Sequence, residues 1–273
     1  MMHAITLEEV QTFLKPRPID AHKGLFGRVL VVGGDHGMPG AVRLAGEGAL
    51  RVGAGLVTVL TRPAHISAVV GERPELLCYG THFSLKILKQ LLANATIVIL
   101  GSGLGQSIWS RRLFDKVFKS DIPMVIDADG LNWLARTAHL PKSPSWILTP
   151  HLGEAARMLG TSNADIQKNR YAAVLALQER YGGVVVLKGA GTLIATAGKE
   201  PVQCLVGNPS MASPGMGDVL SGIIAGLLGQ GLPPWEAAQA GVVLHASAAD
   251  RAVAKQGSRG LLALDLLSEL ADM

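Results

Sequence analysis

Cysteine, excess charge and long apolar runs are all scarce in this chain. Its 273 residues contain two cysteines, Cys78 and Cys204, and neither lies in a C-x-x-C motif or a Cys/His cluster. That pattern provides neither a disulfide framework nor a zinc site, so we expect two reduced core residues. The formal charge is only +4, and lysine and arginine are scattered. We therefore expect no nucleic-acid or membrane surface, whereas acidic metabolites are compatible with this charge.

Targeting and membrane signals are missing too. The amino-terminal stretch MMHAITLEEVQTFL has charged residues where a signal peptide would have its apolar segment. The longest apolar run, Val219 to Leu228, has about half of the roughly 20 residues that a membrane-spanning helix needs. The sequence therefore predicts a cytoplasmic protein.

The chain has instead an excess of glycine and a regular alternation of apolar runs with helical patterns. Its 33 glycines exceed the roughly 7% of average composition, which indicates many tight turns or ligand loops. From Arg28 onward the apolar runs are short, rich in β-branched residues and continuous. They are RVLVVGG, LVTVL, ATIVILGSG, PMVIDADG, WILTP and VVVLKGAG. This pattern predicts an α/β fold with a central, mostly parallel sheet covered by helices on both faces.

The two ends of the chain are predicted to be helical. Thr6 and Glu9 have capping-box spacing and Pro16 follows, so residues 6–14 are expected to form a short helix. After residue 207 the pattern becomes mostly helical, with segments near 218–229, 234–256 and 261–271. We therefore predict an N-terminal helical leader at 1–20 and a single domain at 21–273.

The strongest candidate site is the turn GMGD, Gly215 to Asp218, which runs into an apolar helix pattern. Gly215 and Gly217 can adopt backbone angles barred to other residues, and the free N–H groups at a helix start favour phosphate. Asp218 is then either a helix cap or a base that takes a proton from a substrate hydroxyl beside the phosphate. Gly222 and Gly226 are expected to allow close helix packing.

The segment KGAGT, Lys188 to Thr192, follows the buried-strand run VVVL. A lysine at a strand end is often a solvated edge residue. Here two closely spaced glycines follow it, which favours contact with the phosphate or the ribose of a nucleotide. The P-loop order is absent here, and GGDHGMPGA lacks the G-x-G-x-x-G order. A redox Rossmann enzyme is therefore disfavoured, and the amides of Gly40 and Ala41 could instead bind a substrate at a helix start.

Two further strand ends carry polar residues. In VIDADGLN, Asp127, Asp129 and Asn132 suit turn and cap duties, or binding of Mg²⁺ through water. In TPHLGEAARML, Glu154 lies in the first turn of a predicted helix, where the helix dipole alone favours it. His151 has a less obvious structural role and could bind a substrate or a phosphate.

Five segments, in order between about Lys23 and Leu262, together resemble one family. They are GGDHGMPGAVRLAGEGALRVGAGLVTVLT, VIDADGLN, ILTPHLGEAARML, VVLKGAGT and MASPGMGDVLSGIIAGLLGQG. The chain resembles the ADP-dependent NAD(P)H-hydrate dehydratases of the ribokinase-like superfamily. The resemblance implies a three-layer α/β/α fold and an enzyme that returns the S epimer of hydrated NADH or NADPH to the normal dinucleotide. In the family, a phosphoryl group passes from ADP to the substrate hydroxyl, and phosphate then leaves.

The resemblance also implies roles for particular residues. Ala41, Leu104 and His151 match positions that contact the hydrated dinucleotide. The positions that match the nucleotide site are Lys188, Gly189, Ala190, Gly191, Thr192 and Gly217. Asp218 matches the substrate-contacting catalytic carboxylate, and Gly215, Met216 and Gly217 the phosphate loop. The Asn-x-x-Glu of related kinases is replaced by His151 to Glu154, which leaves Glu154 as the expected Mg²⁺ contact.

The family further suggests ADP as donor, both hydrates as substrates and a homotetramer, none of which spacing or composition decides. Many members carry an amino-terminal epimerase domain, whereas the first strand predicted here begins near Arg28, so we expect a stand-alone dehydratase or a fragment without epimerase activity. Two other functions remain open: a kinase for a vitamin-precursor alcohol, which would release a stable phosphorylated product, and a non-catalytic adenine-nucleotide sensor in which Asp218 is only a cap.

Overall fold

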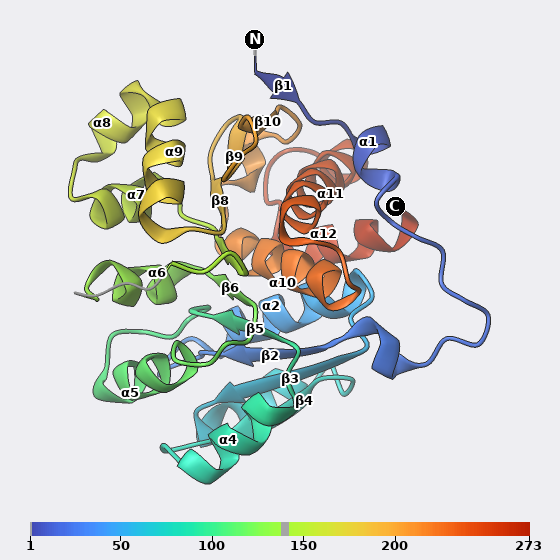
Figure 1. The fold of residues 1–273 in the computed structure, drawn as a ribbon. Coiled ribbons are helices and arrows are strands. Elements are labelled where there is room, and N and C mark those ends of the chain that lie inside the picture. Colours follow the sequence, from blue (N-terminus) through green and yellow to red (C-terminus); the bar gives the residue numbers. More distant parts are fainter. Residues whose placement is uncertain (1, 138–141) are drawn as a thin grey trace.

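The centre of the molecule is one ten-stranded sheet within residues 2–137 and 142–273, which the computed structural model describes (Figure 1). Its strand order is β1-β10-β9-β8-β7-β6-β5-β2-β3-β4. From β8 to β4 in this order all neighbours are parallel, β9 is antiparallel to both of its neighbours, and β1 is parallel to β10. The strands are β1 (His3–Ala4), β2 (Arg28–Val32), β3 (Leu56–Thr61), β4 (Leu77–Gly80), β5 (Ile97–Leu100), β6 (Met124–Ile126), β7 (Trp146–Leu148), β8 (Val184–Leu187), β9 (Thr192–Thr196) and β10 (Val202–Cys204).

Helices cover both faces of the sheet. The central strands carry apolar side chains on both faces, and each face is buried against a layer of helices. In β2, Val29 and Val31 join one hydrophobic cluster, whereas Leu30 and Val32 join the other. The first cluster includes residues of α1 (Leu7–Gln11), α2 (Pro39–Arg51), α3 (Ile66–Val70), α10 (Met216–Gly229), α11 (Pro234–Gln256) and α12 (Ala263–Glu269). The second includes residues of α4 (Leu85–Asn94), α5 (Ile108–Val117), α6 (Ala128–Ala135), α7 (Leu152–Leu159), α8 (Asn163–Lys168) and α9 (Arg170–Tyr181). The predicted three-layer α/β/α architecture is confirmed (Figure 1).

Helix α10 packs unusually close to α2, and its glycines allow this. A Cβ on Gly222 would lie 2.1 Å from the carbonyl oxygen of Ala45, and one on Gly226 would lie 2.7 Å from that of Ala49. Both distances are far below any real Cβ contact. The prediction that these two glycines serve helix packing is therefore confirmed.

The apolar runs predicted as strands form β2, β3, β5, β6, β7 and β8, and the three C-terminal helices form α10, α11 and α12. The predicted N-terminal helix begins after Thr6, whose capping box with Glu9 is present, but it ends at Gln11. Strand β1 precedes it and pairs with β10 at one sheet edge, and Val10 of α1 is buried. The division into a leader at 1–20 and a domain at 21–273 stays a prediction.

Short 3₁₀ helices connect some of these elements: η1 (Lys23–Phe26), η2 (Pro63–His65), η3 (Pro209–Met211) and η4 (Leu270–Asp272). No helix in the described part of the chain combines the length and the apolar character needed to cross a membrane. Both cysteines are free thiols; Cys204 is buried and Cys78 is half-buried.

Candidate active site

A cavity of about 820 Å³ lies where β6, β7 and β8 end and α10 begins. Because these strands are parallel, their carboxyl ends meet at one edge of the sheet, where ligands of open α/β sheets bind. The cavity lining contains most of the predicted site residues. They are Asp127, His151, Glu154, Lys188, Gly189, Ala190, Gly191, Thr192, Met216, Gly217 and Asp218.

Lys188, directly after β8, supplies the positive charge of the cavity. Its Nζ lies 2.8 Å from Asp127 Oδ1 and 3.9 Å from Glu154 Oε2. The other oxygen of Asp127 accepts a hydrogen bond of 2.8 Å from Ser221 Oγ of α10. Although burial opposes it, the charges of Asp127 and Glu154 raise the pKa of Lys188. The ammonium is therefore held in place and charged.

His151 and Glu154 form a reciprocal cap at the start of α7. His151 Nδ1 accepts a 2.9 Å hydrogen bond from the Gly153 amide, while Glu154 Oε2 accepts one of 2.8 Å from the His151 amide. The structure thus gives His151 the structural role that its sequence position did not reveal. Since Nδ1 accepts, the ring proton of the neutral form lies on Nε2. Burial, followed by the charges of Lys188 and Arg157, lowers the pKa of His151, so the ring is neutral at pH 7.

Asp218 lies in the first turn of α10 but does not cap it. The N-cap residue is Gly215, at a left-handed φ of 88°, and no side chain caps this helix. The N–H groups at its start are thus left for a ligand, and glycine is the residue that this φ favours. The interpretation of Asp218 as only a cap is therefore wrong.

The carboxyl groups of the cavity have strongly perturbed acidities. Burial raises the pKa of Asp218 to about 7, and the charge of Asp127 adds to this, while Ser102 and Lys188 oppose it. Burial likewise raises the pKa of Glu154 to about 7, against the effect of Lys188. A carboxyl group with this pKa is partly ionised at neutral pH and can accept a proton from a hydroxyl group.

Gly217 keeps the space beside the lysine open. A Cβ at this position would lie 3.3 Å from Lys188 Nζ and 3.5 Å from Asp127 Oδ2. The backbone start of α10 and the ammonium therefore face the same small volume. An anion placed there would meet N–H groups and a positive charge together.

Five predicted residues lie outside the cavity lining. Asp129 accepts a hydrogen bond of 2.8 Å from the Gly105 amide and one of 3.1 Å from Asn132, and Asn132 accepts one of 2.8 Å from Arg157. These contacts give the pair a structural role, as the turn interpretation predicts, whereas binding of Mg²⁺ through water stays a prediction. The other three are Ala41, Leu104 and Gly215. Leu104 is fully buried, and its amide and carbonyl groups are hydrogen-bonded to Gly101 and Ser110, so its contact with a substrate stays a prediction.

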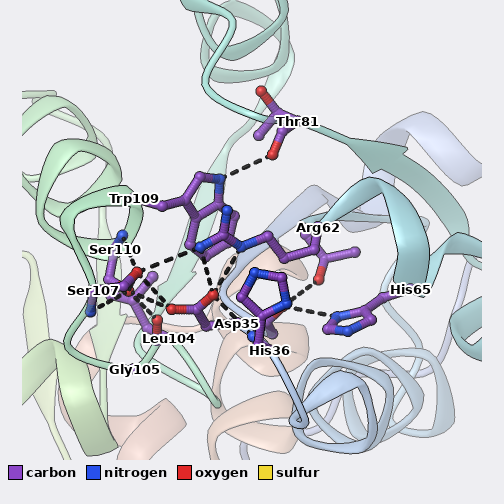
Figure 2. A network of polar contacts seen from close by, with 12 residues as sticks. Asp35, His36, Arg62, His65, Thr81, Leu104, Gly105, Ser107, Trp109 and Ser110 are labelled. Atoms are coloured by element: carbon purple, nitrogen blue, oxygen red, sulfur yellow. Dashed lines mark hydrogen bonds and ion pairs between the residues drawn. The ribbon is translucent and has the colours of Figure 1, made fainter.

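A polar network around Asp35 connects the loop before α2 to the loop after β5, which carries Leu104 (Figure 2). The Asp35 carboxylate accepts hydrogen bonds from Arg62 Nε at 2.7 Å and from Ser107 Oγ at 2.6 Å. Ser110 Oγ links it to the carbonyl oxygen of Leu104 at 2.5 Å. Burial raises the pKa of Asp35, but these hydrogen bonds outweigh it and hold the pKa at about 2. The network holds the loop after β5 beside the start of α2 and leaves Asp35 ionised.

Several residues of the site were not found from the sequence. His245 of α11 lines the cavity, and Ala128 lines it at an unusual φ of 47°. Ser221 of α10 is buried behind the lining, where it donates a hydrogen bond to Asp127. Arg170 of α9 donates hydrogen bonds to the carbonyl oxygens of Ala190 and Leu187, and so holds the KGAGT loop. Of these, Ser221 alone had a signal in the sequence, since it lies three residues after Asp218 on the same helix.

The fold and this site define a three-layer α/β/α protein of the ribokinase-like superfamily. A solved ribokinase-like protein from Enterococcus faecalis superposes with a TM-score of 0.91 at 28% identity, over 99% of this chain and 94% of that one. A hydroxyethylthiazole kinase from Pyrococcus horikoshii shares the fold alone, with a TM-score of 0.63 at 13% identity, over 98% of this chain and 92% of that one.

Sequence comparison narrows this class to one family. The family model described as NAD(P)H-hydrate dehydratase matches residues 29–272. The chain is 54% identical to a bifunctional NAD(P)H-hydrate repair enzyme of Coxiella burnetii, over 94% of this chain and 52% of that protein. It is 42% identical to an ADP-dependent (S)-NAD(P)H-hydrate dehydratase of Neisseria meningitidis, over 94% of this chain and 86% of that protein. The chain belongs to the NAD(P)H-hydrate dehydratase family.

A solved structure of the family agrees with this assignment. The ADP/ATP-dependent NAD(P)H-hydrate dehydratase of Bacillus subtilis, co-crystallised with ATP and Mg²⁺, has a TM-score of 0.88 at 31% identity, over 99% of this chain and 97% of that one. The chain spans about half the length of the bifunctional repair enzymes, with 52% of the Coxiella protein and 50% of that from Escherichia coli covered.

Proposed function

We propose that this protein dehydrates the S epimer of hydrated NADH and NADPH, with ADP as the phosphoryl donor. The observation that carries the proposal is Asp218, whose pKa is about 7, beside the uncapped start of α10 and within one cavity with Lys188. The names of the family members support the substrate and the nucleotide.

The nucleotide phosphates bind at the start of α10. The amides of the turn from Gly215 to Gly217 and the helix dipole favour negative charge there. Lys188, held by Asp127, adds a fixed positive charge. In the KGAGT loop, Gly189 and Gly191 have positive φ angles of 138° and 64°, and this loop contacts the remainder of the nucleotide.

The chemistry has two steps. Asp218 takes the proton of the substrate hydroxyl group while the hydroxyl oxygen attacks the terminal phosphorus of ADP. A new O–P bond forms, and AMP leaves with the electrons of the broken P–O bond. The phosphorylated ring then loses inorganic phosphate by C–O cleavage. A proton passes from the neighbouring ring carbon to water, and the electrons of the broken C–H bond form the ring double bond as the phosphate leaves. Hydroxide is a poor leaving group, and phosphorylation converts it to a good one.

The donor set fits Mg²⁺, although the described residues contain no preassembled group of three metal ligands. Mg²⁺ is commonly bound by one or two carboxylates together with waters and substrate phosphates. Glu154 would hold the ion, and Asp127 would support it through water, since both line the cavity. When bound, the ion supplies positive charge that neutralises the phosphoryl oxygens during transfer.

The test supplies hydrated NADH with ADP, and separately with ATP, and follows the absorbance of reduced nicotinamide. We expect recovery of the absorbance, with release of AMP and inorganic phosphate when ADP is the donor. A stable phosphorylated product without recovery would support the alcohol kinase, and nucleotide binding without turnover would support the sensor. No recovery with either nucleotide would refute the dehydratase.

The finer assignments are part of the same proposal. We propose that both hydrates are substrates and that the protein is a cytoplasmic homotetramer without nucleic-acid or membrane partners. The family resemblance supports the tetramer, and the small, scattered charge supports the absence of such partners. Light scattering of the purified protein tests the tetramer, and competition between the two hydrates tests the substrate range.

A further inference from the structure

Arg170 lies behind the KGAGT loop and outside the cavity. It is the first residue of α9, and its two Nη groups donate hydrogen bonds to the carbonyl oxygens of Ala190 and Leu187, the second at 3.1 Å. Ala190 and Gly191 line the cavity, whereas Arg170 does not. The arginine therefore holds the loop from the side that faces away from the cavity.

The first glycine of this loop gives the arginine room. A Cβ on Gly189 would lie 3.3 Å from Nη2 of Arg170, which is tighter than most real Cβ contacts. The glycine also has a φ of 138°, a backbone conformation that other residues adopt only with strain. A side chain at position 189 would therefore press on the guanidinium that holds the two carbonyl oxygens.

The charge of Arg170 has no carboxylate partner in the described part of the chain. Burial lowers the pKa of Arg170, and no carboxylate acts against this effect. The Nε atom is buried without a hydrogen-bond partner among the described residues. A guanidinium is not deprotonated in proteins, so the group stays charged. A buried donor without a partner costs folding free energy, so the stability of the fold does not account for an arginine at this position.

The hydrogen bonds from Arg170 fix the direction of two peptide groups. The described peptide bonds are all trans, and in a trans peptide the C=O and N–H groups point in opposite directions. Because the carbonyl of Ala190 points to Arg170, the amide of Gly191 points away from it, toward the cavity. The Leu187 carbonyl turns the Lys188 amide in the same way, but that amide already donates to a backbone carbonyl oxygen at 2.9 Å. No described residue accepts a hydrogen bond from the Gly191 amide, so this N–H remains for a ligand.

The charge of the arginine also makes this N–H a stronger donor. Hydrogen bonds in a chain polarise one another, so a cation at the Ala190 oxygen leaves the amide hydrogen of Gly191 more positive. We propose that Arg170 is a positioning residue for the nucleotide: it orients and polarises the peptide between Ala190 and Gly191, whose N–H donates to a phosphate or ribose oxygen. The proposal rests on the proposed function, since it takes ADP as the occupant of the cavity.

The experiment measures the Kd of ADP by calorimetry for the wild type and for Arg170→Ala. We expect the Kd to rise about tenfold in the variant, which corresponds to about 1.4 kcal/mol. Guanidinium chloride, far below denaturing concentrations, should enter the space left by the side chain and restore most of the affinity. Potassium chloride at the same concentration should not. The matched control is Arg180→Ala on the same helix, because Arg180 is exposed and does not line the cavity, and its Kd should equal that of the wild type.

Two further arms locate the contact and separate it from a loss of structure. Inorganic pyrophosphate, measured as a competitor of ADP, should lose as much affinity as ADP if the acceptor is a phosphate oxygen, and none if it is a ribose oxygen. In steady-state kinetics of Arg170→Ala, the KM for ADP should rise with the Kd. Both kcat and the KM for the hydrate should stay unchanged, because Arg170 touches no reacting atom.

A last measurement does not depend on the folding of a variant. In ¹⁵N-labelled wild-type protein, ADP should move the amide proton resonance of Gly191 downfield, as a new hydrogen bond does. An unmoved resonance, an unchanged Kd in a folded Arg170→Ala protein, or a loss that guanidinium does not restore would overturn the role of Arg170. A wild type that binds ADP but dehydrates no hydrate would refute the proposed function alone, and one that binds no ADP would refute both.

Discussion

Replacing Asp218 with Asn should stabilise the protein and abolish most of its activity. The stability should rise because ionising the buried carboxyl group of Asp218 costs folding free energy. The pKa of this group is about 7 in the folded protein against an ordinary 3.8. Each unit corresponds to about 1.4 kcal/mol, so the ionised Asp218 costs up to about 4 kcal/mol of folding free energy above pH 7.

The sign follows from the proton count in the two states. Below pH 3.8 the group is protonated in both the folded and the unfolded chain. Between that pH and about 7, the unfolded chain has lost the proton that the folded chain keeps, so the stability of the wild type falls as pH rises. The amide of the variant carries no such cost, and the advantage of Asp218→Asn should be about 2 to 3 kcal/mol larger at pH 8 than at pH 5.

Urea unfolding of both proteins at pH 5 and pH 8 measures this difference. The matched control is Asp165→Asn, because Asp165 occupies the same first-turn position in α8 but is exposed, and Ser162 and Thr161 lower its pKa. The control should gain nothing at pH 8. A stability difference for Asp218→Asn that does not change with pH would refute the assignment of a raised pKa. In the same variant, ADP binding should persist, and kcat should fall by about 10² to 10⁴.

Four further substitutions test separate parts of the account. Two lie in the cavity, one lies between α10 and α2, and one lies in the polar network around Asp35. Gly217→Ala should fold normally but weaken ADP binding at least tenfold by calorimetry, because its Cβ would lie 3.3 Å from Lys188 Nζ in the space for the phosphate. Gly222→Ala should instead lower the free energy of unfolding by about 1 to 3 kcal/mol, since its Cβ would lie 2.1 Å from the Ala45 carbonyl oxygen. Lys188→Met should raise the Kd of ADP at least tenfold, because it removes the ammonium from the cavity. Asp35→Asn should cost about 2.5 kcal/mol at pH 7 by urea unfolding, because the folded pKa of about 2 lies about 1.8 units below the ordinary 3.8 and each unit corresponds to about 1.4 kcal/mol. Because the folded pKa of Asp35 is about 2, this contribution is present above its unfolded pKa near pH 4 and is lost as pH falls toward 2.

Each of these substitutions has a contrary outcome. Unchanged ADP affinity in Gly217→Ala would show that the phosphate does not bind at the start of α10. Unchanged ADP affinity in Lys188→Met would show that the lysine does not contribute to nucleotide binding. A stable Gly222→Ala would contradict the close approach of α10 and α2. An Asp35→Asn protein as stable at pH 7 as the wild type would show that the network in Figure 2 contributes little to folding.

Much of the fold could be predicted because it depends on local patterns. The central strands are buried on both faces, so their apolar runs mark them directly in the sequence. Strands β1, β4, β9 and β10 were not predicted. Strands β1 and β4 are the two edges of the sheet, β1 has only two residues, and Leu77 and Tyr79 of β4 are exposed. Strands β9 and β10 are internal, and their buried apolar residues form only short runs. Short edge strands carry little apolar signal of their own.

The candidate site was predictable where its residues follow a strand or begin a helix. Asp127, His151 and Lys188 each come at or just after the end of a strand, and parallel pairing brings them into one cavity. What could not be predicted is which of two plausible roles each residue takes. The spacing of Asp129 fits metal binding and turn formation equally, and its structural role becomes visible only in the hydrogen bonds from Gly105 and Asn132. His245, which also lines the cavity, had no local signal, since it lies inside α11 rather than at a strand end or a helix start.

The central claim, that the hydroxyl group is phosphorylated before it leaves, has one direct test. Hydrated NADH labelled with oxygen-18 in the ring hydroxyl is converted by the protein with unlabelled ADP, and the inorganic phosphate is analysed by mass spectrometry. The account predicts that the label appears in the phosphate. In the phosphorylated intermediate the labelled oxygen joins carbon to phosphorus, and it is the C–O bond that breaks, so the oxygen leaves with the phosphate. Label released as water, with unlabelled phosphate, would contradict it.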